Sequence, residues 1–116
     1  MKLQNQVTSL ELSKKLKELG VKQESLFYWQ MLPNGEFFLR AGTATFNGCK
    51  IIASAFSVAE IGEMLPNCTQ SWCVEKEWIC IFKCVSGFMD EFYGNTEADS
   101  RTKLLIHLIE KGIVKP

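Results

Sequence analysis

The sequence feature that most constrains the fold is the segment "SVAEIGEMLP" at residues 57–66, which predicts one short helix with a defined start and end. Ser57 can accept a hydrogen bond from the amide three residues further on, and Glu60 can return one to the Ser57 amide, which is the capping-box arrangement. Pro66 ends the helix, because the residue before a proline avoids helical dihedral angles. The runs on either side favour strands, so this chain combines helices with β structure.

A longer helix is predicted near the start of the chain. We expect it to begin at Thr8, whose hydroxyl caps the first turn while Glu11 returns a bond to the cap amide. Gly20 ends it, since glycine readily takes the left-handed conformation that closes a helix. Its buried stripe consists of Leu12, Leu16 and Leu19.

The third helix is predicted at the other end of the chain. Thr96 and Asp99 are its candidate capping residues, and Gly112 is its stop. Helical spacing predicts a buried face made of Ala98, Arg101, Leu105, Leu108 and Ile109. His107 lies beside this face, which is typical of a boundary side chain.

Strand signals fill the rest of the chain. The trio Pro33-Asn34-Gly35 predicts a hairpin, and a second turn signal at residues 47–48 precedes a further β-favouring run, so we expect a meander of three strands. Residues 71–85 fit either two strands that meet near Glu75-Lys76 or one long strand. Residues 88–93 predict a last edge strand, where Asp90 and Glu91 discourage pairing with other sheets.

The predicted fold class is therefore α+β: an antiparallel β-sheet with an N-terminal helix, a short middle helix and a C-terminal helix packed on it. With 116 residues, 47% of them hydrophobic, the chain fits a single domain over residues 1–116. Basic and acidic residues number 13 each, which excludes a general positive field for nucleic acid. Apolar runs fall far short of the roughly 20 residues that cross a membrane, so we expect a cytoplasmic protein with no membrane contact.

The sequence predicts no catalytic, cofactor or metal site. The cysteines are odd in number and follow no signal peptide, which favours free thiols over a disulfide framework. Their spacing lacks the paired pattern of zinc sites. No phosphate-binding glycine loop occurs, and nothing in the sequence brings His107 together with a nucleophile and a carboxylate. We expect a protein that is not an enzyme; its cysteines are Cys49, Cys68, Cys73, Cys80 and Cys84.

Aromatic side chains are the candidate binding residues. A chain this small with three Trp and eight Phe can hardly bury every ring, so an exposed aromatic surface is expected. Large rings and arginine concentrate binding energy at protein interfaces. The predicted binding residues are Tyr28, Trp29, Arg40, Trp72 and Trp78.

Nucleic-acid binding is the alternative hypothesis. Residues 12–29 resemble the outline of a helix-turn-helix, in which Gln23 and Ser25 reach base edges and four lysines meet phosphates. The strand character of residues 25–32, aromatic and bounded by a turn, argues against a recognition helix there. The lysines are Lys14, Lys15, Lys17 and Lys22.

Three blocks, residues 9–29, 54–66 and 96–112, carry a resemblance. Together they resemble a family of small uncharacterised proteins encoded by bacteriophages and prophages. The resemblance implies a mobile-element setting in the bacterial host cytosol, and it assigns no activity, cofactor or catalytic residue. We therefore expect a small phage or prophage accessory protein that binds another protein, with self-association left open and nucleic acid less favoured.

Overall fold

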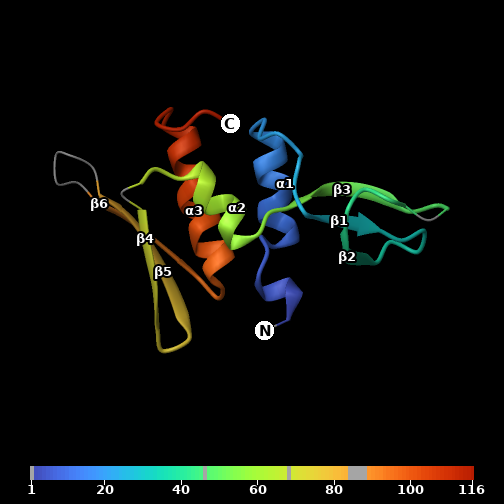
Figure 1. The fold of residues 1–116 in the computed structure, drawn as a ribbon, viewed down its shortest axis with the longest axis horizontal. Coiled ribbons are helices and arrows are strands. Elements are labelled where there is room, and N and C mark those ends of the chain that lie inside the picture. Colours follow the sequence, from blue (N-terminus) through green and yellow to red (C-terminus); the bar gives the residue numbers. More distant parts are fainter. Residues whose placement is uncertain (1, 46, 68, 84–88) are drawn as a thin grey trace.

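Three α-helices lie between two three-stranded antiparallel sheets (Figure 1). The computed structural model describes residues 2–45, 47–67, 69–83 and 89–116. The α+β class and the order of the helices are as predicted, but the strands form two sheets where the sequence predicted one. The elements are η1 (Leu3–Asn5), α1 (Leu10–Glu18), β1 (Phe27–Met31), β2 (Phe37–Ala41), β3 (Lys50–Ala55), α2 (Val58–Met64), β4 (Thr69–Val74), β5 (Glu77–Lys83), β6 (Met89–Gly94) and α3 (Glu97–Glu110).

The first sheet has the strand order β2-β1-β3. The predicted hairpin is confirmed, since the chain turns at Gly35, where φ is +91°, and the Leu32 amide bonds to the Glu36 carbonyl. The predicted meander is wrong, because β3 pairs with β1 rather than with β2. Strand β3 thus lies on the other side of β1 from β2, which makes β1 the central strand.

The second sheet has the order β4-β5-β6. Of the two alternatives for residues 71–85, the structure shows two strands, joined by Glu75 and Lys76 with φ of 48° and 69°. Two successive residues at positive φ are typical of a type I′ turn, whose twist matches that of the paired strands. The last strand, β6, lies at the edge of the sheet as predicted.

Side-chain caps begin α2 and α3 as predicted. The Glu60 amide donates to the Ser57 hydroxyl over 3.2 Å, and the Ser57 amide donates to the Glu60 carboxylate over 3.0 Å. At α3 the Asp99 amide donates to the Thr96 hydroxyl. Gly20 follows α1 with φ of +91°, so the predicted glycine stop is confirmed as well.

The start of α1 differs from the prediction, since Thr8 does not cap the helix. Thr8 is fully buried, and its hydroxyl lies 2.9 Å from that of Thr102 in α3 and 3.2 Å from the Phe56 carbonyl. The N-cap is Ser9, whose amide donates to the Asp99 carboxylate over 2.8 Å. A carboxylate from another helix thus binds the start of α1, and this contact cannot be read from local sequence.

Helix α3 supplies most of the core. Ala98, Leu105 and Leu108 are fully buried as predicted, whereas Arg101 and Ile109 are only half-buried. The buried face is wider than one stripe, because β4–β6 cover one side of α3 while α1 and α2 cover others (Figure 1). The additional buried side chains of α3 are Ser100, Thr102, Leu104 and Ile106. The leucines of α1 join this core, with Leu16 fully buried and Leu12 and Leu19 packed against it.

We expect the Ser57→Ala substitution to lower the free energy of unfolding by about 0.5–2 kcal/mol, because it removes the cap bond to the Glu60 amide. Ser9→Ala is the matched control, since Ser9 is also an N-cap but its side chain makes no cap bond. Chemical denaturation of both variants checks the prediction. Equal losses of stability in the two variants would contradict it.

Candidate functional site

The five predicted binding residues lie on two different sheets and do not form one surface. Tyr28, Trp29 and Arg40 belong to β1 and β2, and Trp72 and Trp78 belong to β4 and β5. Tyr28 and Arg40 are directly opposite in the first sheet. Trp29 follows Tyr28 in β1 and therefore points to the other face.

The rings of β1 make contacts within the fold. Tyr28 is 7% exposed, and its hydroxyl accepts a bond from the Ser25 amide over 3.2 Å. Trp29 is half-buried, and its indole N–H donates to the Thr8 carbonyl over 2.9 Å. These bonds attach β1 to the segment before it and to the start of α1. Both rings therefore have a structural role, and Arg40 beside them is half-buried.

The two tryptophans of the second sheet face opposite ways. Trp78 is half-buried and lines an open cavity of about 670 Å³ between η1 and the starts of α2 and α3. The cavity is also lined by polar side chains that include Asn5, Asn95 and Glu97. Trp72 is 40% exposed on the side of the sheet that faces away from α3.

Trp72 belongs to an exposed apolar row across the second sheet. It lies directly opposite Ile79 of β5, which lies directly opposite Tyr93 of β6. Tyr93 is 45% exposed and Val74 is 49% exposed. Strand alternation places Ile81 on the same face. We call this surface the outer patch: Trp72, Val74, Ile79, Ile81 and Tyr93.

Carboxylates accompany the outer patch. Glu77 and Glu91 are exposed and share its face by alternation along β5 and β6. The Tyr93 hydroxyl donates to the Glu91 carboxylate over 2.7 Å. This hydrogen bond, together with the negative charges of Glu91 and Glu77, raises the pKa of Tyr93. Tyr93 therefore stays protonated beyond its ordinary range and presents an apolar ring with a fixed polar end.

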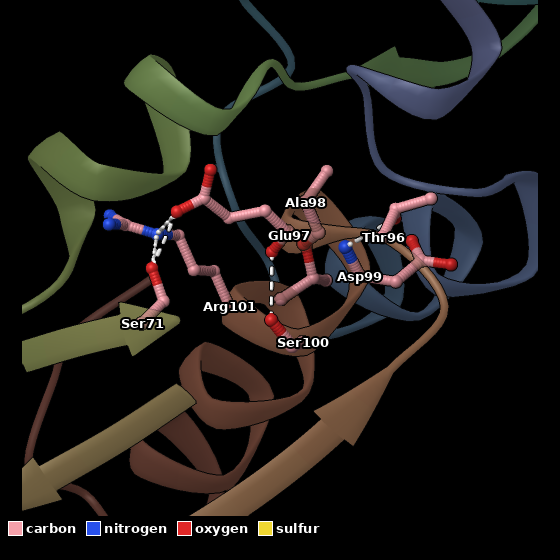
Figure 2. A network of polar contacts seen from close by, with 8 residues as sticks. Ser71, Thr96, Glu97, Ala98, Asp99, Ser100 and Arg101 are labelled. Carbon is pink, nitrogen blue, oxygen red and sulfur yellow. Dashed lines mark hydrogen bonds and ion pairs between the residues drawn. The ribbon is translucent and has the colours of Figure 1, made fainter. Parts of the chain in front are cut away.

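A polar network holds β4 against α3, on the side of the sheet opposite to the outer patch (Figure 2). The Ser71 hydroxyl of β4 donates to the Glu97 carboxylate over 2.6 Å and accepts from the Arg101 Nε over 3.0 Å. Glu97 and Arg101 form an ion pair of 3.5 Å one turn apart on α3. Because all three side chains are partly buried, the network fixes the position of the strand that carries Trp72.

The lysines of the nucleic-acid hypothesis are dispersed. The Lys17 ammonium donates to the Ile52 carbonyl over 2.9 Å, and that of Lys14 lies 5.1 Å from the centre of the Phe37 ring. Lys22 pairs with Glu24 at 3.4 Å in solvent. Residues 27–31 form β1, so no recognition helix follows α1.

The cysteines that the structure describes, Cys49, Cys73 and Cys80, carry free thiols, and Cys68 and Cys84 lie outside the described residues. Within residues 2–45, 47–67, 69–83 and 89–116, no three His, Cys, Asp or Glu side chains lie close enough to hold a metal ion. In that same part of the chain, no helix has the length and apolar character to cross a membrane. His107 is half-buried, with its ring 5.1 Å from that of Phe92.

Comparison of the chain with protein-family models, with curated proteins and with solved structures finds no match. The candidate site therefore depends on geometry alone. Sequence reasoning named Trp72 but missed Tyr93, Ile79 and Val74. Alternation along β4, β5 and β6 could have found them, but only once the turn at Glu75-Lys76 had been placed.

We expect Glu91→Gln to lower the pKa of Tyr93, because the neutral amide is a weaker acceptor for the phenol and carries no charge to oppose the phenolate. An NMR titration of the tyrosine rings measures this shift. Glu63→Gln serves as the control, because Glu63 is an exposed residue of α2 and lies outside this site. An unchanged Tyr93 titration in Glu91→Gln would contradict the contact.

Cys80 should resist alkylation in the folded protein. It is fully buried, and burial raises its pKa to about 11, with Glu97 adding to the rise and Arg101 opposing it. Iodoacetamide at about pH 8 should label exposed Cys73 and leave Cys80 unlabelled until denaturant is added. Peptide mapping by mass spectrometry reads both sites, and equal labelling rates in the folded state would exclude the buried placement.

Proposed function

We propose that this chain is a protein-binding module and that its partner covers the outer patch. The observation that carries the proposal is the row Trp72–Ile79–Tyr93, which crosses all three strands of a sheet face that no described element covers. Large aromatic side chains are typical of the residues that dominate protein interfaces, and here they stand at both ends of the row. The patch lies flat on a sheet face, which suits a macromolecular partner better than a small ligand.

The surface area of the molecule supports this proposal. A compact chain of 13.2 kDa is expected to expose about 6,400 Å², whereas this chain exposes 7078 Å². The molecule extends 52 × 32 × 19 Å, so it is thin for its length. A thin molecule has more surface for its mass than a compact one, and the outer patch is part of that surface.

The described charges favour a basic partner surface. Glu77 and Glu91 flank the apolar row, and the Tyr93 hydroxyl already donates to Glu91. A partner that places apolar side chains on Trp72 and lysine or arginine near these carboxylates would complement both features. In this proposal the protein is a phage or prophage accessory factor, as the sequence resemblance implies, and it works in the cytosol of a bacterial host.

Replacing Trp72 or Tyr93 with lysine should weaken partner binding by about 2 kcal/mol or more, since each replacement removes one of the two aromatic contacts of the row. Leu26→Lys is the matched control, because Leu26 is 65% exposed but lies outside the outer patch. The immobilised protein and its variants are incubated with bacterial lysate, with and without nuclease treatment, over a salt series. A partner retained by wild type and by the Leu26 variant, and lost by the other two, supports the proposal.

Two outcomes would count against the proposal. Equal retention by all variants would remove the outer patch from the interface. Loss of all bound material on nuclease treatment, with a steep decrease at higher salt, would favour the nucleic-acid alternative. In that case reversal of Lys14 and Lys15 to glutamate should have the larger effect.

A further inference from the structure

The hydrogen-bonding groups of β4 alternate between its neighbour β5 and the open edge of the sheet. In a two-residue hairpin the residues that flank the turn, Val74 and Glu77, form a hydrogen-bonded pair. Trp72 therefore also bonds to β5, and the N–H and C=O groups of Ser71 and Cys73 point away from it. The Thr69 amide fits the same alternation: it points away from β5 and bonds to the Pro66 carbonyl over 3.1 Å. Among the described residues, none bonds to the outward backbone groups of Ser71 and Cys73.

On two other edge strands, β3 and β6, side chains of the same molecule form hydrogen bonds with the outward backbone groups. On β3, Lys17 donates to the Ile52 carbonyl and Gln23 accepts from the Ser54 amide over 2.8 Å. On β6, Lys103 donates to the Tyr93 carbonyl over 2.7 Å. These contacts hinder a further strand from pairing there. The edge of β4 has no such side chain among the described residues.

The edge of β2 is also open, but its surroundings differ. Its exposed ring, Phe37, already has the Lys14 ammonium above it, and β2 does not border the outer patch. The six residues of β4 contain no charge, no proline and no glycine, and one of them is Trp72. An added strand beside β4 would extend the face on which the outer patch lies.

Helix α2 would cover the inner face of such an added strand. Figure 2 shows α2 on the side of β4 that faces away from β5. Arg101 of α3 lies close to both elements, because its Nε binds Ser71 and its Nη1 lies 3.1 Å from the point where a side chain at Gly62 would begin. The inward side chains of an added strand would therefore meet α2. A second copy paired symmetrically on β4 would bring its own α2 to the same space, so a single extended segment fits better.

We propose that β4 binds an extended segment of the partner protein as a fourth strand of the second sheet. This inference rests on the proposed function and specifies its binding mode. Backbone bonds to Ser71 and Cys73 supply affinity, and alternate apolar side chains of the segment extend the row at Trp72. Lysine or arginine in the segment fits beside Glu75 and Glu77, the exposed carboxylates at the turn end of β4.

A designed peptide tests the binding mode without knowledge of the natural partner. The probe has about eight residues, alternating valine and threonine with lysine at both ends. At saturation it should slow hydrogen exchange of the Ser71 and Cys73 amides by about tenfold or more and leave the Trp72 amide, already bonded to β5, unchanged. The same peptide with alternate amides N-methylated should lose this effect, because its pairing edge has no donors. That comparison requires no change in the protein.

Protein variants provide the second arm. Cys73→Pro removes one outward N–H at an exposed edge position and should weaken peptide binding by about tenfold or more. Ala41→Pro makes the matched change at an exposed position on the open edge of β2 and should leave binding unchanged. Circular dichroism verifies that both variants are folded.

Three results would overturn the proposal. The first is no binding of the peptide at about 1 mM. The second is binding that depends on Trp72 but gives no protection of Ser71 and Cys73, in which case the outer patch still binds protein and strand addition fails. The third is protection of these amides that rises with protein concentration in the absence of peptide, which would identify a second copy as the occupant.

Discussion

The burial of α3 is the constraint on which the rest of the structure depends. Its leucines fill the space between the second sheet and the other two helices, and its first turns bind both the start of α1 and strand β4. Asp99 binds the start of α1, Thr102 contacts Thr8, and Arg101 holds Ser71 of β4. Apolar burial supplies the larger free energy, while these polar contacts specify the orientation of each element on the helix. The position of β4, and with it the outer patch, therefore follows from the packing of α3.

Local signals predicted the helices and turns because their physics lies within a few residues. The Ser57–Glu60 cap and the Gly20 stop each depend on neighbours in sequence, and the structure confirms both. Thr8 shows that a local capping pattern does not always predict the contact that a side chain makes. Its sequence context fits a capping box, but its hydroxyl lies against Thr102, 94 residues away, and Asp99 takes over the start of the helix. Likewise the separation into two sheets depends on which strands lie on each side of the helix layer, and no turn signal encodes that choice.

The candidate site was predictable only in part for the same reason. Composition alone indicated that some aromatic rings remain exposed, but it did not show which ones. Tyr28 and Trp29 satisfy their polar ends within the fold, whereas Trp72 and Tyr93 point away from the helices. The difference arises because β4–β6 cover α3 with one face and have no described element on the other. The first sheet contributes contacts that maintain the fold, whereas the second leaves one apolar face exposed.

The turn between β4 and β5 has a consequence for solubility. Glu75 and Lys76 adopt positive φ, where glycine and asparagine are favoured, and left-handed backbone costs roughly 1–2 kcal/mol for each residue with a side chain. Glycines would relieve that strain but would remove the charges of Glu75 and Lys76 and leave Glu77 alone at this end of the uncharged strand β4. Charged residues that flank such segments act as gatekeepers against aggregation. The strained turn therefore exchanges some folding stability for protection of an exposed sheet edge from uncontrolled assembly.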